Sequence, residues 1–340
     1  MPKKILVIQT AFIGDVILTL PMIHVLKWNV QGSEVDVMCI PSAENIFKNN
    51  PDINKLILFD KKGTDKGIRG FRRILGEIKN KYDIIIAPHR SLRTALLVKF
   101  SGCKETISFD RSSYNKVYTH KVAYQDNAHE IVRNLSLLAP LGIERKEIIR
   151  PELYLSISER EAVERYLESQ RIEDYEKFIT IAPGSVWFTK AFPEKKFIKM
   201  LDFLASVDMK IIFVGGTMDA GLSGILKVGS KNFNLYNAAG RLTILQSAEL
   251  IRRSSVLVTN DSAPLHIANA VGTKVIALFG ATIPEFGFYP IGKDDVIFET
   301  KGLKCRPCGI HGGNKCPIET FVCMEKIDEF DVCREILKSA

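Results

Sequence analysis

Short apolar runs alternate along this chain of 340 residues with longer stretches in which apolar residues recur every three or four positions. Runs of four to seven residues rich in Val and Ile are typical of buried parallel strands, and the longer period is typical of amphipathic helices. Strands are predicted in the first half at 4–9, 34–40, 55–59, 83–88, 106–109 and 121–124, and in the second half at 178–185, 210–216, 234–240, 255–261 and 274–280. Helices are predicted between them, among them 16–28 and 70–79, and others starting near 193, 219, 244 and 263.

This alternation predicts an α/β protein with two Rossmann-like domains in series and a cleft between them. A proline-punctuated extended stretch and a helix near the middle of the chain indicate a connection between the domains. We expect one domain over residues 1–170, a second over 175–325, and a final helix over 326–340 that crosses back to the first domain. Ligands of open α/β sheets bind at the carboxyl ends of the strands.

Composition is that of a globular protein, with 46% hydrophobic and 25% charged residues. No apolar run approaches the roughly 20 residues that a membrane helix needs. The apolar stretch that follows the first lysines is too short for a signal peptide. These observations predict a cytoplasmic protein.

Positive charge is concentrated in the first half of the chain. Residues 1–150 contain 24 Lys and Arg against 15 Asp and Glu, whereas residues 151–340 contain 23 against 24. A basic half beside a neutral half indicates an anionic partner for one domain, although a solvated basic face is the plainer alternative. A phosphorylated small molecule and an anionic lipid surface fit equally well, while a nucleic-acid signature is missing from the sequence.

Three loops at predicted strand ends combine residues that suit an anionic ligand. In "QTAFIGDVILTLP" (9–21) a strand leads through Gly14 to Asp15 at the start of a helix. The alternative is that Asp15 only caps this helix. The loop departs from the G-x-G-x-x-G pattern of dinucleotide phosphate sites.

The second loop is "IAPGSVWFTKAFPEKKF" (181–197), where Ser185 and Lys190 follow a strand. A hydroxyl and a lysine supply hydrogen-bond donors and positive charge for phosphate oxygens. The alternative is a solvated loop lysine.

The third loop is "TNDSAPLHIANAVG" (259–272), where Asp261 and Ser262 end a strand and Ala263 and Pro264 begin a helix. The first amides of this helix, up to and including that of His266, would form an anion site that the helix dipole strengthens. The alternative is an Asp or Ser cap with a core-facing His266.

Four of the seven cysteines cluster in "CRPCGIHGGNKCPIETFVC", at Cys305, Cys308, Cys316 and Cys323. Four cysteines that begin with a C-x-x-C pair are typical of a structural zinc or iron–sulfur site in a cytoplasmic protein. Disulfides and free thiols remain alternatives.

Together these stretches resemble glycosyltransferase family nine, the ADP-heptose–lipopolysaccharide heptosyltransferases, which have two Rossmann domains in the GT-B arrangement. "ILVIQTAFIGDVILTLP", "APGSVWFTKAFP", "NAAGRLTILQSAELI" and "VTNDSAPLHIANAVGTKVIALFG" fall in the family's order and spacing over essentially the whole chain. "HEIVRNLSLLAPLGI" is more similar to the branch that adds the second heptose.

The resemblance implies an inverting transferase that needs no cofactor for catalysis. It implies Asp15 as the general base and a donor site for ADP-heptose in the second half. The donor-binding residues implied are Ser185, Lys190, Asp219, Asp261, Ser262, Ala263 and His266. Asp219 stands where the family often has Glu near the ribose.

The acceptor implied by the resemblance is Kdo-lipid A of the lipopolysaccharide inner core, already carrying a heptose. Arg90, Arg93 and Arg111 are the candidates for binding it, because arginine suits carboxylate and phosphate groups. Because the implied acceptor is a lipid, we also expect peripheral contact with the inner membrane. We expect no nucleic-acid partner. A transferase that adds the first heptose or uses another nucleotide sugar, a sugar-nucleotide epimerase and a non-catalytic nucleotide-binding module remain alternatives.

Overall fold

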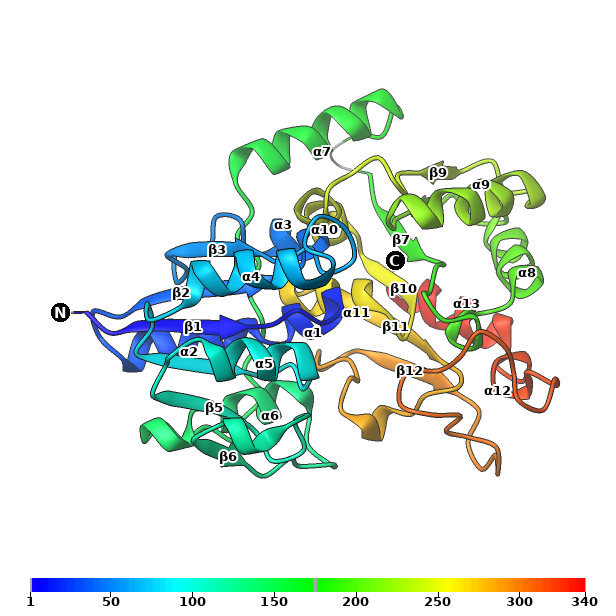
Figure 1. The fold of residues 1–340 in the computed structure, drawn as a ribbon. Coiled ribbons are helices and arrows are strands. Elements are labelled where there is room, and N and C mark those ends of the chain that lie inside the picture. Colours follow the sequence, from blue (N-terminus) through cyan, green and yellow to red (C-terminus); the bar gives the residue numbers. More distant parts are fainter. Residues whose placement is uncertain (1, 174–175, 340) are drawn as a thin grey trace. The chain divides into compact units, whose positions relative to one another are not determined.

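The structure, a computed structural model, describes residues 2–173 and 176–339 and divides into two compact units, Met1–Tyr154 and Leu155–Ala340 (Figure 1). Each unit contains a six-stranded sheet in which every pair of neighbouring strands is parallel. Parallel strands need crossover connections, and α-helices supply most of them in both units. The predicted α/β class with two Rossmann-like units is confirmed.

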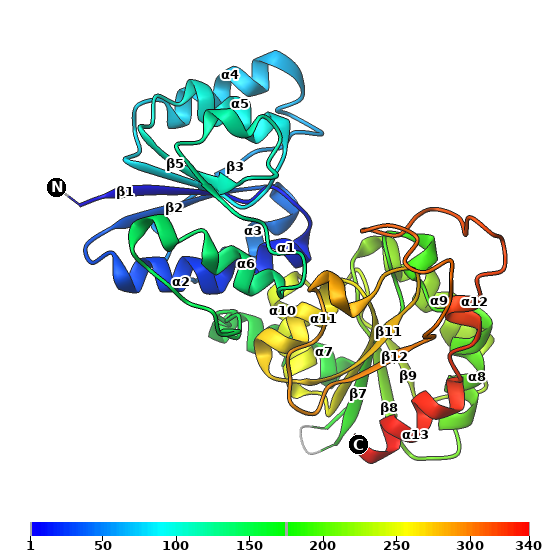
Figure 2. The same ribbon diagram turned by 90° about the horizontal axis from the view of Figure 1, so that it is seen from below.

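In unit 1 the strand order is β3-β2-β1-β4-β5-β6. The strands are β1 (Lys4–Ile8), β2 (Glu34–Cys39), β3 (Lys55–Leu58), β4 (Ile84–Ala87), β5 (Glu105–Phe109) and β6 (His120–Val122). The helices are α1 (Ile13–Ile17), α2 (Leu20–Asn29), α3 (Glu44–Phe47), α4 (Gly67–Ile78), α5 (Leu92–Phe100) and α6 (Glu130–Ser136). Figure 2 shows α4 and α5 on one face of this sheet and α2 and α6 on the other.

In unit 2 the order β12-β11-β10-β7-β8-β9 repeats that connectivity. The strands are β7 (Phe178–Ala182), β8 (Lys210–Phe213), β9 (Leu235–Asn237), β10 (Val256–Asn260), β11 (Lys274–Phe279) and β12 (Val296–Glu299). The helices are α7 (Ile157–Ser169), α8 (Glu194–Leu204), α9 (Ala220–Gly229), α10 (Ile244–Arg253), α11 (Ala263–Val271), α12 (Val322–Glu325) and α13 (Glu329–Ser339). The sequence pattern missed β12, whose four residues are all partly exposed at the edge of the sheet.

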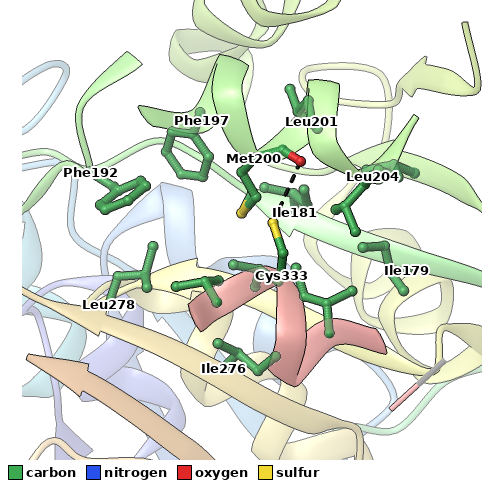
Figure 3. Close-up of a cluster of buried hydrophobic side chains, with 14 of the residues drawn as sticks. Ile179, Ile181, Phe192, Phe197, Met200, Leu201, Leu204, Ile276, Leu278 and Cys333 are labelled. Carbon is green, nitrogen blue, oxygen red and sulfur yellow. Dashed lines mark hydrogen bonds between the residues drawn. The ribbon is translucent and has the colours of Figure 1, made fainter. Parts of the chain in front are cut away.

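The terminal helix α13 packs inside unit 2, against α8 and β11. Cys333 and Ile336 of α13 are fully buried among Met200, Leu201 and Ile276, and the Cys333 thiol donates to the carbonyl oxygen of Met200 at 3.6 Å (Figure 3). Each such buried side chain contributes about 1.5–3 kcal/mol to folding. This helix, for which a crossing to the first domain was expected, therefore forms part of the second unit's core.

The boundary between the units lies after Tyr154 and differs from the expected one near residues 170–175. The reason is α7, which begins with a capping box formed by Ser156 and Glu159 and packs on α10 of unit 2.

In the described parts of the chain, no helix combines the length and apolar character that would let it span a membrane.

Candidate functional site

In unit 2, a lysine and an aspartate from two distant loops meet at the carboxyl edge of the sheet. The Lys190 ammonium lies 2.6 Å from Asp261 Oδ2, and both side chains are largely buried, with 15% and 7% exposed. Thr282 Oγ1, in the loop after β11, donates to the same carboxylate oxygen at 2.6 Å. The structure thus brings together two residues that the sequence analysis assigned to a donor site, and adds Thr282.

Asn260, the last residue of β10, holds this corner in place. It is fully buried, its side-chain oxygen accepts the amide of Phe192 at 2.9 Å, and its Nδ2 donates to the carbonyl oxygen of Pro183 at 2.8 Å. These two bonds position both ends of the loop that carries Ser185 and Lys190. The sequence analysis assigned Asn260 no role, although a polar residue at the end of an apolar strand was an available signal.

The N-terminus of α11 follows directly after Asp261. Ser262 is the N-cap residue, yet no side chain caps this helix. The alternative interpretation, in which Asp261 or Ser262 serves as a helix cap, is therefore wrong. The amide of Leu265 donates to the Ser262 carbonyl oxygen at 3.1 Å, so the predicted anion site at this end does not include it.

His266 and Ser185 occupy different surroundings. His266 is 4% exposed, and its ring lies edge-on to that of Phe288 with 6.4 Å between centroids. Ser185 lies in the partly exposed loop after β7, where its hydroxyl accepts the amide of Trp187 at 3.3 Å. Ser185 is therefore the more accessible of the two predicted donor-site residues.

Asp219 lies against the same loop after β7. Its carboxylate accepts the amide of Gly216 at 2.8 Å, and burial raises the pKa of Asp219 above its ordinary value. A Cβ atom at Gly184 would lie 1.8 Å from Asp219 Oδ1. A larger residue at 184 would therefore displace the Asp219 carboxylate from its present position. The structure therefore gathers Lys190, Asp261 and Asp219 around one loop.

The cysteine segment braces the Lys190 loop. Thr189 donates its amide to the carbonyl oxygen of Gly313 at 3.0 Å, and Gly313 donates its amide to Thr189 Oγ1 at 2.8 Å. Arg306, 5% exposed in its side chain, donates to the carbonyl oxygens of Gly280 and Thr282 at 2.7 Å each and pairs with Glu299 at 2.7 Å. The segment around the first cysteines thus supports both Lys190 and Thr282.

All seven cysteines are free in the structure. Cys308 and Cys316 lie near enough to Cys323 to raise the pKa of its thiol further, after burial. Among the described residues, however, no three His, Cys, Asp or Glu side chains are grouped so that they could hold a metal ion. The zinc or iron–sulfur site predicted at Cys305, Cys308, Cys316 and Cys323 is therefore not formed in this structure, where free thiols occupy the segment.

In unit 1, Asp15 lies in the first turn of α1, which starts directly after the loop that follows β1. Phe12 is the N-cap residue of α1, and it makes no side-chain capping hydrogen bond. The alternative in which Asp15 is the N-cap residue is therefore wrong. Gln9 holds the loop, since its Nε2 donates to Thr19 Oγ1 at 2.9 Å and its Oε1 accepts the amide of Ala11 at 3.3 Å.

Three arginines surround one aromatic ring near this edge. The guanidinium carbons of Arg90, Arg133 and Arg111 lie 4.3, 4.8 and 5.5 Å from the centroid of Tyr124. Arg111 is also paired with Asp126, with both side chains more than half exposed. The structure therefore brings Arg90 and Arg111 together, and adds Arg133, which the sequence analysis did not single out.

Arg93 belongs to a neighbouring basic group. It donates to the carbonyl oxygen of Lys61 at 3.1 Å, and the Lys61 ammonium donates to the carbonyl oxygen of Thr10 at 2.6 Å. His89 contacts Thr10 Oγ1 at 2.9 Å. Burial and the positive charges of Lys61 and Arg90 lower the pKa of His89 to about 4. Burial lowers the pKa of Lys61 as well, and the Arg93 charge adds to this effect. The lowered pKa values mean that further positive charge on these side chains is unfavourable. A bound anion would relieve this repulsion.

Comparisons with known proteins agree with this architecture. A family model described as glycosyltransferase family 9 (heptosyltransferase) matches residues 71–313. Lipopolysaccharide heptosyltransferase 3 of Escherichia coli is 28% identical over 281 residues, which cover 80% of this chain and 82% of that protein.

Two solved structures share the fold over nearly the whole of both chains. The glycosyltransferase family 9 protein from Veillonella parvula DSM 2008 has a TM-score of 0.84 and 24% identity, and covers 99% of this chain and 98% of its own. ADP-heptose lipopolysaccharide heptosyltransferase II of E. coli has a TM-score of 0.78 and 17% identity, with 98% of each chain covered. The family model spans well over half of the sequence, and the chain belongs to glycosyltransferase family 9, the heptosyltransferase family.

Proposed function

We propose that this enzyme transfers L-glycero-D-manno-heptose from ADP-heptose to a lipopolysaccharide inner core that already carries heptose. The observation that carries this proposal is the difference between the carboxyl edges of the two sheets. One is a Lys190–Asp261 corner beside an uncapped helix N-terminus, and the other is a cation-rich edge next to Asp15. The names of the E. coli relatives, heptosyltransferase 3 and heptosyltransferase II, support a heptosylated acceptor.

The corner in unit 2 is proposed to hold the donor. Negative charge grows on the diphosphate as the bond to the anomeric carbon breaks, and preorganised donors stabilise that charge. Lys190 and the first amides of α11, those of Ser262 and Ala263, would supply these donors. Asp261 would accept hydrogen bonds from the sugar hydroxyls, and Asp219 would lie toward the ribose. Ser185 and His266 complete the proposed donor set.

Asp15 is proposed to be the general base. The acceptor hydroxyl must lose its proton as its oxygen attacks the anomeric carbon, and a positioned carboxylate can take it. Asp15 suits this role because it lies in the first turn of α1, directly after the loop that follows β1 at the carboxyl edge of the sheet. Such a base contributes about 10²–10⁴-fold to the rate.

The basic edge of unit 1 is proposed to bind the anionic acceptor. Arg90 is partly buried beside Tyr124, and among the described residues it has no ion-pair partner. Arg93 and Lys61 lie in the neighbouring basic group. Arg111 already pairs with Asp126, so it would have to exchange that carboxylate for the acceptor.

We further propose that the start of α4 and the loop before it contact an anionic membrane. Lys62, Lys66, Arg69 and Arg72 are exposed there, and Ile68 is 72% exposed between them. The two acids of this segment are used internally, because Asp60 accepts the amides of Gly63 and Thr64, and Asp65 pairs with Arg73. The remaining cations complement anionic headgroups, each contributing about 1 kcal/mol near such a surface.

The test is ADP release from ADP-heptose with Kdo-lipid A carrying no, one or two heptoses, for wild type and Asp15→Ala. Turnover that requires a heptosylated core, and that falls at least 10²-fold in Asp15→Ala while ADP affinity is unchanged, is the expected result. The number of heptoses required identifies the position that is extended. Vesicles of anionic and neutral lipid that carry the same acceptor test the membrane contact, with faster turnover expected on the anionic ones.

Turnover with none of these acceptors, despite ADP-heptose binding, would contradict the proposal. Release of ADP without any acceptor that is equally fast in Asp15→Ala would contradict the role of Asp15.

A further inference from the structure

A second carboxylate, Glu130, is buried near Asp15 and has no role in the mechanism described so far. Glu130 is the first residue of α6 and is 8% exposed. Buried glutamates are rare unless they are paired or functional. Asn134 of the same helix donates to the carbonyl oxygen of Leu18 at 3.1 Å, where α1 ends. This bond fixes α6 against the helix that carries Asp15, and Figure 2 shows the two helices on the same face of the sheet.

The cation beside Glu130 is shared with other acceptors. Arg133 donates from Nη1 to Glu130 Oε2 at 3.0 Å, and its side chain is 2% exposed. The same guanidinium donates from Nε to the carbonyl oxygen of Gln125 at 2.7 Å and from Nη2 to that of Asp126 at 2.6 Å. Arg133 therefore anchors the segment before α6 as well as the carboxylate.

Other titratable groups face Glu130 from each neighbouring element. They are Asp15 on α1, Arg90 in the loop after β4, and Tyr124 in the segment before α6. On α6 itself, His129 precedes Glu130. The helix α2 packs along α6, and its His24 is bonded to Asp52. Burial raises the pKa of Glu130 to about 7, and the Asp15 charge adds to this while Arg133 and Arg90 oppose it.

We propose that Glu130 is a positioning residue for the transfer reaction: its buried negative charge, held in place by Arg133 beside Asp15, strengthens Asp15 as a base. This inference rests on the proposed role of Asp15. An isolated aspartate is ionised at neutral pH and is a weak base. A second carboxylate nearby makes a proton on Asp15 more favourable, because it relieves the repulsion between like charges.

In the step itself, the acceptor hydroxyl gives its proton to the Asp15 carboxylate. The oxygen forms the new bond to the anomeric carbon, the bond from that carbon to the diphosphate breaks, and the electron pair leaves on ADP. Glu130 remains ionised throughout and touches neither substrate. The proton on Asp15 then passes to solvent and restores the pair of carboxylates.

The pH dependence of kcat tests this inference. When Glu130 takes up a proton, Asp15 loses the neighbouring charge and becomes a weaker base. Wild-type kcat should therefore fall as the pH falls through about 7. Coupled carboxylates titrate as a pair, so the acidic limb of the pH profile reports on Glu130 and Asp15 together. Glu130→Gln should lose this limb, with a profile that is flat down to about pH 5 and a plateau about three- to tenfold lower. Glu130→Asp should retain the limb.

Glu249→Gln is the matched control, because Glu249 is also a buried carboxylate and pairs with an arginine three residues later on a helix of unit 2. Its pH profile should keep the wild-type shape. If Glu130→Gln keeps the limb near pH 7, or lowers kcat equally at every pH, Glu130 is only structural and the inference is overturned.

A second measurement is independent of turnover and therefore separates this inference from the proposed function. Carboxyl ¹³C NMR titration of the substrate-free protein should show the Asp15 midpoint move to lower pH in Glu130→Gln, and the Glu130 midpoint move to lower pH in Asp15→Asn. Midpoints that stay in place in both variants would overturn the coupling, even if the enzyme proves to be a heptosyltransferase.

Discussion

The two units repeat one strand order, yet the carboxyl edges of their sheets are built in opposite ways. In unit 2 the lysine at the edge is already matched, since Lys190 pairs with Asp261 and Thr282 bonds to the same carboxylate oxygen. In unit 1 positively charged side chains lie close together, and burial, with the charges of Lys61 and Arg90 added, lowers the pKa of His89. One edge is organised before any ligand arrives, whereas the other carries an excess of positive charge.

This difference suggests two ways to build an anion site on one fold. A matched pair keeps donors in a fixed geometry, which suits the stabilisation of charge that develops only during bond breaking. Unmatched cations lose repulsion when an anion binds, which suits the capture of a substrate that is anionic from the start. The same substitution, a cation to alanine, should therefore have different consequences in the two units.

Lys190→Ala should have the largest effect. We expect kcat to fall about 10²–10³-fold, because a preorganised donor at the leaving group is lost. Thermal stability should fall too, since Asp261 is left as a buried carboxylate without its cation. Steady-state kinetics and a thermal melt measure the two effects. Lys199→Ala is the control, because that lysine is 64% exposed on the same unit. A kcat within threefold of wild type would remove Lys190 from the donor site.

Arg90→Ala and Arg93→Ala should act on the acceptor alone. Each should raise the acceptor KM about tenfold, in line with the loss of one charge-assisted hydrogen bond, and leave ADP-heptose affinity intact. Stability should change by about 1 kcal/mol or less, because no carboxylate is left unpaired: each variant loses an aromatic contact, and Arg93→Ala also loses one hydrogen bond to the carbonyl oxygen of Lys61. Arg145→Ala, an exposed arginine of the same unit, should change neither parameter. Weaker donor binding in Arg90→Ala would contradict the division of roles.

His89→Gln should have the smallest effect, visible only in the pH dependence of stability. The folded pKa of about 4 lies below the ordinary value near 6.5, so the unfolded chain binds more protons between these values. Wild type should lose stability as the pH falls from about 6.5 to 4, by up to about 1.4 kcal/mol for each pH unit from this group. Urea unfolding at pH 7 and pH 5 should show a smaller loss in His89→Gln. An equal loss of stability in both proteins would mean that the pKa of His89 is not lowered in the folded protein.

Sequence patterns were enough to predict the two sheets and most of the residues at their carboxyl edges. Apolar runs end at the loops that contain Asp15, Ser185 and Asp261, and the ends of parallel strands meet at one edge of a sheet. The same logic could not detect β12, because its partly exposed residues at a sheet edge lack a continuous apolar pattern. Nor could it place α7, whose capping box is a local signal but whose packing partner is α10.

The sequence by itself determined the fold class, the family and the identity of the local motifs, because periodicity, strand ends and loop composition are local properties. Only the tertiary structure decided which polar groups meet. Asn260 reaches Pro183, Arg306 reaches Gly280 and Thr282, and Glu130 lies near Asp15. It also decided that neither Asp15 nor Asp261 is the N-cap residue of the helix that follows its strand. These contacts join residues that are distant in the chain, and they depend on how the helices pack on the sheets, which no local pattern encodes.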